Sequence, residues 1–325
     1  MRMQKKLKNS KKLLDSKLVF PTNFHTMYGS FFMFVSIIPS LHSLGVEPLL
    51  YSFDAPLKNQ LQVGQLVEIP FGKNTENGII ADIYETSPID TSSEAFNRIK
   101  PIIKIVTTKT LLDLYQIQMI IHISKQYMIP IHRVLAIFLT RPILSRLEKK
   151  NYEQIEEKNI QEEVGIGKKI ISLLQDDIVR PQYLEKYLKW ESTVVILPDD
   201  FSIIPYREYF SKNKDFLFVT NDMTDTRRAQ AWIDITNGIF PTICWTRKLL
   251  YYNLSKYQNI IYIEDALGPD YWHYPVRINY NDILRIFEKS NSNTNIHILT
   301  SIPTISTLTH FRHFELKNIS SSSLA

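Results

Sequence analysis

Short apolar segments that alternate with helical sequence constrain the fold of the C-terminal half most strongly. Five apolar runs are found, at residues 194–197, 216–219, 240–244, 259–263 and 296–300. Residues 225–237 and 280–289, which lie between them, place apolar residues at helical spacing. Short strands that alternate with helices form parallel sheets in α/β folds. Residues 191–325 are therefore predicted to form a parallel α/β lobe.

The N-terminal half has a different pattern, which is rich in β-branched residues. Three strand-like segments are found, at residues 66–71, 78–84 and 100–106. A polar turn at 72–77 joins the first two, and the Ser/Thr-rich stretch 86–98 is predicted to be a loop. The apolar run 31–38 is too short to span a bilayer, so a buried strand is predicted there. Residues 28–108 are expected to form one β-rich domain.

The middle of the chain, residues 109–190, has the spacing of helices. Thr110 is the predicted N-cap of a first helix, and a second helical segment runs through 131–149. The charged stretch 148–163 is predicted to be a linker or an exposed helix. Residues 167–190 are predicted to form two short helices that are broken near Pro181.

The positive charge of the chain is concentrated at its start. The formal net charge is +5, but seven basic residues against the single Asp15 give the first 20 residues a charge of +6. The remainder of the chain therefore carries a net charge of −1. We interpret residues 1–27 as a basic, disordered arm. Contact with DNA phosphates and a purely solubilising role both remain open for it.

Several classes of site are disfavoured by the sequence. Cys244 is the single cysteine, which excludes an internal disulfide or a cysteine-based zinc site within one chain and fits a reducing cytoplasm. The string 165–169 has Lys169 where a phosphate loop needs a Mg²⁺-binding hydroxyl, so a helix start is favoured there. We expect no bound metal and no cofactor. The apolar strand 260–263 ends in Glu264 and Asp265, a pair that can hold Mg²⁺, but a solvated strand end is favoured.

Two regions resemble the primosomal protein N′ (PriA) family of replication-restart DNA helicases. In the C-terminal half, five residues fall on the motifs of the family's first helicase lobe, namely Arg228, Trp232, Gly238, Thr246 and Arg247. Residues 260–271 fall on the family's DEEH box, and Arg277, Asp282 and 299–303 match later motifs. The resemblance implies a multidomain α+β and α/β fold: a β-rich 3′-end DNA-binding domain, a reduced winged-helix region and one degenerate RecA-like lobe.

The N-terminal region is similar to the 3′-end DNA-binding domain of the same family. The similarity implies that Tyr51, Gly72, Lys73 and Lys100 bind DNA, with Tyr51 stacked on a base, Gly72 allowing close backbone approach and Lys100 on a phosphate or the 3′ end. Simpler explanations exist for two of these residues: Gly72 is required by the geometry of a turn, and Lys100 is a solvated charge. Leu50 stands where the family has an aspartate, so preference for a free 3′ end is expected to weaken.

The departures from the family affect its motor. The DEEH box has become Glu264-Asp265-Ala266-Leu267, no phosphate loop precedes residue 194, and neither a second lobe nor a zinc insertion follows. We therefore expect a non-enzymatic protein that binds forks and 3′ ends in replication restart, in the cytoplasm, without membrane contact. Other restart proteins are candidate partners. A helicase subunit completed by another chain and a non-catalytic interaction scaffold are the alternatives, and oligomeric state and preferred DNA structure stay open.

Overall fold

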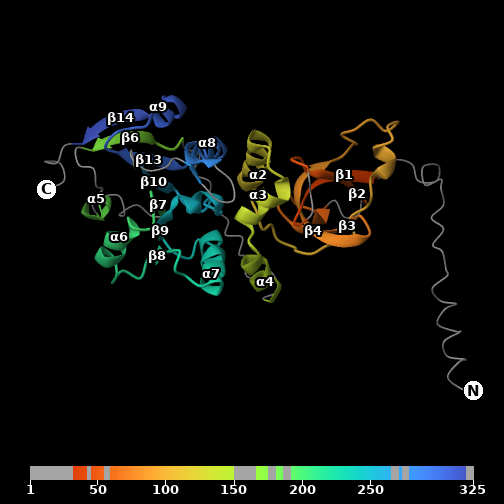
Figure 1. The fold of residues 1–325 in the computed structure, drawn as a ribbon, viewed down its shortest axis with the longest axis horizontal. Helices are drawn as coiled ribbons and strands as arrows, with labels where there is room; N and C mark the ends of the chain where they lie inside the picture. The colour runs from red at the N-terminus through yellow and green to blue at the C-terminus, as the bar shows by residue number, and fades with distance from the viewer. Residues whose placement is uncertain are drawn as a thin grey trace, which may run out of the picture.

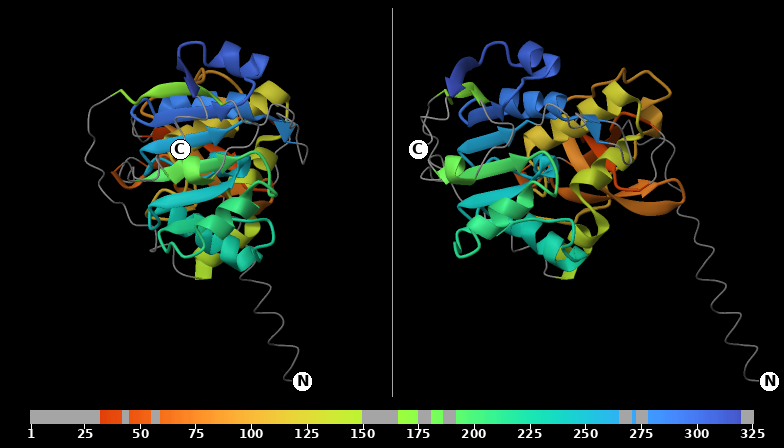
Figure 2. Two further views of the ribbon diagram at one scale, coloured as in Figure 1. Left: turned by 90° about the vertical axis from the view of Figure 1, so that its left-hand side faces the viewer. Right: turned by 60° about the vertical axis from the view of Figure 1, so that its left-hand side comes forward.

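The fold contains two main sheets, with a layer of helices between them. The computed structural model describes residues 32–41, 45–54, 59–149, 166–174, 181–185, 192–264, 271–272 and 278–319. Helices of the middle region stand between an antiparallel sheet and a parallel sheet (Figure 1), and the right-hand view of Figure 2 shows the same order. The predicted mixed α/β class is confirmed at this level. The basic arm, the stretch 150–163 and Asp265 lie outside the described residues.

The antiparallel sheet has the strand order β2-β1-β4-β3-β5. Its strands are β1 (Phe32–Pro39), β2 (Leu49–Asp54), β3 (Leu66–Phe71), β4 (Asn74–Tyr84) and β5 (Lys104–Ile105). Alternate side chains of each strand point to one face, so Val35 and Ile37 of β1 meet Tyr51 and Phe53 of β2 in a shared core. The buried strand predicted at 31–38 is confirmed, whereas the strand predicted at 100–106 shrinks to the two residues of β5.

The hairpin between β3 and β4 is tighter than the sequence predicted. Phe71 pairs with Asn74, so the loop is only Gly72 and Lys73, and the six-residue polar turn was wrong. Residues 74–77 extend β4 instead, because Glu76 is buried in the sheet and its carboxylate accepts the backbone N–H of Leu41. Gly72 has φ +61° while Lys73 keeps the usual negative φ, which is the pattern of a type II′ hairpin turn.

The helical layer consists of three helices rather than the two predicted for this stretch. They are α2 (Leu114–Tyr127), α3 (Ile131–Phe138) and α4 (Arg141–Lys149). Asp113, not Thr110, caps α2: its carboxylate accepts from Gln116 N at 3.0 Å, and the Gln116 side chain accepts from Asp113 N at 3.1 Å. The second predicted helix divides after Phe138 because Pro142 has no N–H to continue the hydrogen-bond ladder.

The parallel sheet contains seven strands in the order β14-β6-β13-β10-β7-β9-β8. They are β6 (Lys169–Leu174), β7 (Thr193–Leu197), β8 (Phe216–Phe218), β9 (Thr242–Thr246), β10 (Asn259–Ile263), β13 (Asn295–Thr300) and β14 (Glu315–Ile319). The associated helices are α5 (Pro181–Glu185), α6 (Ile203–Tyr209), α7 (Asp225–Thr236), α8 (Tyr280–Ser290) and α9 (Ile305–His310). Two short strands, β11 (Tyr271–Trp272) and β12 (Ile278–Asn279), form a separate ribbon. The five predicted strands and both predicted helices of this lobe are confirmed.

Strand β6 overturns the first of the two short helices predicted for residues 167–190, whereas the short helix α5 begins at Pro181, where the second was expected. Strand β6 pairs with β13 and β14 inside the sheet, so the sheet also draws on sequence before residue 191. Lys169 begins this strand, which also contradicts the helix start predicted for the phosphate-loop-like string. Gly167 is required just before it, because a Cβ there would lie 2.2 Å from the Thr294 carbonyl oxygen.

The helical layer joins both sheets through one continuous core. Tyr115 of α2 packs edge-on against Phe287 of α8, with ring centres 5.2 Å apart, and Phe138 of α3 meets Tyr251 in the same way. Gln116 Nε2 also donates to the Tyr251 carbonyl at 2.9 Å. Within the described part of the chain, none of the helices combines the length and apolar character that a bilayer crossing requires.

Candidate nucleic-acid interface

A cavity of about 620 Å³ opens on the antiparallel domain. Three separate segments line it: the start of β2, the β3–β4 turn and residues 89–100. The lining residues are Leu49, Leu50, Tyr51, Pro70, Phe71, Gly72, Ile89, Glu94, Ala95, Arg98, Ile99 and Lys100. Three of the four DNA-binding residues predicted from the sequence, Tyr51, Gly72 and Lys100, therefore share one cavity with Leu50. Lys73 lies beside Gly72 in the turn and is not among the lining residues.

Backbone pairing with β2 holds Lys100 in place. Ser52 N donates to the Lys100 carbonyl at 3.0 Å, and Ile102 N donates to the Ser52 carbonyl at 2.9 Å. Residues 100–102 thus continue the sheet along the outer edge of β2. The Lys100 side chain is exposed and makes no hydrogen bond or ion pair with any described residue. Its positive charge is available to a ligand in the cavity.

Tyr51 is more buried than a stacking platform would be. Only 5% of the residue is exposed, and its hydroxyl donates to the Pro70 carbonyl at 3.2 Å. Burial raises the pKa of the hydroxyl, with a smaller contribution from the charge of Glu76, so the group stays protonated. Tyr51 supports the chain just before the hairpin turn. Stacking of its ring on a base stays a prediction.

The structure of Gly72 is consistent with both of its predicted roles, turn geometry and close approach of a ligand to the backbone. Its φ of +61° is a conformation that favours glycine, so the turn itself requires this residue. Nothing lies within 4 Å of the position that a Cβ would occupy, and a ligand can approach the backbone there closely. Leu50 is half-buried in the same wall and presents an apolar surface.

Glu94 and Arg98 line the cavity although the sequence predicted only a loop for this region. They lie four residues apart around the short 3₁₀ turn η2 (Phe96–Arg98), and the Arg98 guanidinium donates to the Glu94 carboxylate. Phe96 packs against Phe34 of β1, with ring centres 5.9 Å apart, and anchors the loop on the sheet. The i,i+4 spacing of opposite charges was the one signal in the sequence that pointed to this pair.

In the parallel lobe, Glu264 follows β10 directly and is 5% exposed. Its carboxylate accepts hydrogen bonds from the hydroxyls of Thr304, at 2.8 Å, and Thr307 of α9. Asn281 of α8 donates to the same Thr307 hydroxyl at 3.3 Å. Across the described residues, no cluster of three potential metal ligands is found. Glu264 is thus tied into the helices beside the strand end, which contradicts the solvated strand end favoured from the sequence.

The residues that carry the resemblance in this lobe hold its structure together. Arg228 donates to the carbonyls of Asn221, at 3.1 Å, and Met223, at 2.9 Å, and fixes the loop after β8. Trp232 is fully buried, and Arg247 is 3% exposed with its guanidinium 5.2 Å from the centre of the Tyr280 ring. Arg277 lies outside the described residues.

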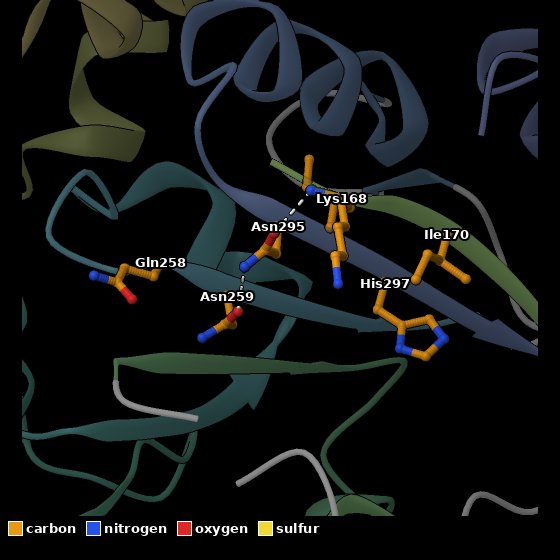
Figure 3. Close-up of a pocket in the computed structure, with 7 residues that line it drawn as sticks. Lys168, Ile170, Gln258, Asn259, Asn295 and His297 are labelled. Carbon is orange, nitrogen blue, oxygen red and sulfur yellow. Dashed lines mark hydrogen bonds between the residues drawn. The ribbon is translucent and has the colours of Figure 1, made fainter. Parts of the chain in front are cut away.

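A second cavity, of about 410 Å³, lies at the amino ends of the parallel strands. Figure 3 shows Asn295 between Asn259 and Lys168: its amide donates to Asn259 Oδ1 and its oxygen accepts from Lys168 N, both at 2.8 Å. His297 bonds to the buried Ser172, and burial lowers the pKa of His297 to about 4. The side chains of Asn259 and Asn295 are bonded in this way to each other and to the backbone of Lys168, so we interpret the cavity as structural.

Fold and cavity together define an α/β protein whose N-terminal module offers a partly basic cavity of nucleotide size. Residues 46–140 match the PriA_3primeBD family model, described as "3'DNA-binding domain (3'BD)". The matched residues run from just before β2 to just after α3, so this part of the chain is similar to a 3′ DNA-binding domain. Comparison with curated proteins finds no match.

One solved structure that the chain resembles is the "Crystal structure of Pyrococcus furiosus Hef helicase domain". The two are 13% identical, and the match covers 56% of this chain and 39% of that chain with a TM-score of 0.35. This likeness is too weak to support an inference about the present lobe.

Proposed function

We propose that this chain binds branched or 3′-ended DNA through the cavity on its N-terminal domain, in replication restart, and that it has no ATP-driven motor. One observation carries the proposal: Tyr51, Gly72 and Lys100, from three distant segments, line a single cavity on the domain that matches the 3′ DNA-binding model.

The chemistry of the cavity suits the end of a DNA strand. Its volume of about 620 Å³ lies within the range of about 300–1,000 Å³ typical of small-molecule sites, so one nucleotide fits. Lys100 offers a free positive charge to a phosphate, Gly72 offers open backbone, and Leu50 offers an apolar wall for a sugar or base. Leu50 has no hydrogen-bond acceptor, which weakens recognition of the terminal base.

A comparison of two lysines tests this proposal. Lys100 lines the cavity, whereas Lys104, on the same domain, forms an ion pair with Glu68 at 2.8 Å and does not. We expect Lys100→Ala to weaken binding to every DNA and to reduce the log–log salt slope by about 0.7–0.9, the value of one phosphate contact. Lys104→Ala is expected to bind like the parent. Fluorescence anisotropy with 3′-hydroxyl and 3′-blocked forks measures both. Equal binding by the parent and Lys100→Ala would refute the proposal.

The C-terminal lobe is proposed to be a degenerate RecA-like lobe without ATPase activity. The sequence has no phosphate loop, and one oxygen of Glu264, Oε1, accepts from the hydroxyls of both Thr304 and Thr307. The alternative is a helicase subunit completed by a partner chain. DNA-stimulated phosphate release by the purified protein with Mg²⁺ and ATP, abolished in Glu264→Gln, would establish that alternative.

Exposed apolar side chains favour a contact with another protein as a second role. Phe201 is 83% exposed in the connection after β7, and Ile305 is 82% exposed at the start of α9, which follows β13. Single exposed apolar residues are common, but several at one edge indicate a binding surface. If the parent protein shows no DNA affinity at low salt, the hypothesis of an interaction scaffold without DNA binding replaces the proposal.

A further inference from the structure

We infer that Glu94 determines which strand end the cavity accepts, favouring a 3′-hydroxyl over a 3′-phosphate. The inference rests on the proposed function, because it concerns the same cavity and the same class of ligand. It adds a residue that neither the sequence motifs nor the domain match singles out.

The cavity has a positive net charge and also contains one carboxylate that can accept a hydrogen bond. Glu94 supplies the carboxylate among the described lining residues, and it is paired with Arg98. The two charges offset one another, and Lys100 then gives the described lining a net charge of +1. DNA is thus still attracted, while a carboxylate oxygen remains at the cavity wall. The second oxygen of Glu94 makes no hydrogen bond with any described residue.

The chemistry of a strand end explains what this carboxylate does. A 3′-hydroxyl has a proton to donate, and an ionised carboxylate can only accept. A 3′-phosphate presents negative oxygens, which the carboxylate repels. The other candidates do not perform this role: Leu50 has no polar atom, and the Tyr51 hydroxyl already donates to the Pro70 carbonyl at 3.2 Å. Glu94 is therefore the side chain available to distinguish the two ends.

The geometry of the loop lets Glu94 adjust to a ligand. The side chains of Glu94 and Arg98 are 80% and 75% exposed, and an exposed ion pair of this kind contributes little and rearranges easily. The backbone is held more firmly, because Phe96 packs against Phe34. The carboxylate thus stays at the cavity while its rotamer is free to follow the strand end.

Binding of one 5′-labelled single strand with three different ends tests this inference. The ends are 3′-hydroxyl, 3′-deoxy and 3′-phosphate, and anisotropy gives the three dissociation constants for each variant of the full chain. We expect the parent to prefer the hydroxyl end. Glu94→Gln keeps an acceptor oxygen but removes the charge that repels a phosphate, so the hydroxyl-to-phosphate preference is expected to fall by about twofold to fivefold, the size of an exposed charge–charge interaction. Glu94→Ala is expected to abolish the hydroxyl-to-deoxy preference as well.

Two further variants separate this role from a general charge effect. Arg98→Gln is expected to weaken binding to all three ends without reducing the preference for the hydroxyl. Glu47 is a matched control, because it forms an exposed pair with Lys125 at 2.9 Å and does not line the cavity. Glu47→Gln is expected to keep the parent's preference.

The outcomes distinguish failure of this inference from failure of the proposed function. If the parent binds DNA but does not prefer the hydroxyl end, the inference is wrong and the function stands. It is equally wrong if Glu94→Gln keeps the preference, or if Glu47→Gln loses it to the same extent. If the parent binds none of the three strands, the proposed function fails and the inference fails with it.

Discussion

A buried carboxylate at the start of α2 gives the sharpest physical prediction for this protein. Asp113 caps the helix that joins the two sheets, and one of its oxygens accepts from Gln116 N. The other oxygen is buried without a partner among the described residues. Burial raises the pKa of Asp113 from the ordinary value of 3.8 to about 7, and the hydrogen bond from Gln116 opposes this shift. Ionisation of Asp113 therefore destabilises the folded state.

The size of the effect follows from proton linkage. Below the unfolded-state pKa of 3.8, Asp113 is protonated in both states and its contribution to stability is fully present. That contribution is lost as pH rises through the folded-state pKa of about 7. One pH unit is worth about 1.4 kcal/mol, so a pKa difference of about three corresponds to about 4 kcal/mol as an upper limit.

The test replaces Asp113 with asparagine, which remains a good N-cap but carries no charge. We expect the free energy of unfolding of Asp113→Asn, relative to the parent, to rise steadily between pH 4 and pH 8. Urea unfolding followed by tryptophan fluorescence at several pH values measures this gap. Asp90→Asn is the control, because hydrogen bonds from Ser92 lower the pKa of the exposed Asp90 and its gap stays flat over this range. A flat gap for Asp113→Asn would refute the reasoning.

Three further substitutions have defined outcomes. Leu50→Asp is expected to sharpen the preference for a free 3′ end in the anisotropy assay, because Leu50 lines the cavity and an aspartate there supplies an acceptor. Gly64→Ala is expected to lower the free energy of unfolding by about 1–3 kcal/mol from backbone strain alone, since φ is +89° and a Cβ would meet the Leu112 carbonyl oxygen. His297→Gln is expected to remove a loss of stability that the parent shows as pH falls from 6.5 towards 4, because the folded-state pKa of His297 is lowered to about 4.

Strands of the parallel lobe were predictable because both of their faces are buried. Such strands are short continuous apolar runs, and residues 193–197 and 259–263 are buried at every position. The same property made β6 ambiguous, since a short apolar run such as 170–174 does not distinguish a strand from a buried helix by periodicity. Its pairing with β13, more than 120 residues later in the chain, decides the matter. The sequence around β6 does not indicate that β13 is its partner strand.

The predictions for the start of α2 and for the β3–β4 turn were wrong because contacts with distant residues override the local signal. Thr110 has the right chemistry for an N-cap, but the N–H groups of Leu111 and Leu112 are bound to the Gly64 carbonyl, so the helix begins only after Asp113. The hairpin turn was predicted too long because polar residues such as Glu76 favour a loop by composition. In the fold, Glu76 has a buried backbone partner and belongs to the strand. In both cases a tertiary contact decided between two locally acceptable conformations.

A minority of the residues that line the cavity could be predicted, and the part that was missed has a physical explanation. Tyr51, Gly72 and Lys100 lie on or beside strands, where a motif fixes the position of each residue in the sheet. Glu94 and Arg98 belong to a loop, whose composition predicts solvent exposure but not the direction in which it folds. Contact of Phe96 with Phe34 directs this loop against the cavity, and no sequence pattern identified that pair.

The residues that still resemble a helicase lobe are those on which packing depends. Trp232 fills the core, Arg228 binds loop carbonyls and Arg247 lies against Tyr280, so each one is needed whether or not ATP binds. One oxygen of Glu264, Oε1, accepts from the hydroxyls of Thr304 and Thr307. These two hydrogen bonds to Glu264 Oε1 link the end of β10 to the start of α9. The proposed loss of the motor is therefore compatible with a fully folded lobe, and we expect Glu264→Ala to destabilise the protein while DNA binding by the N-terminal cavity persists.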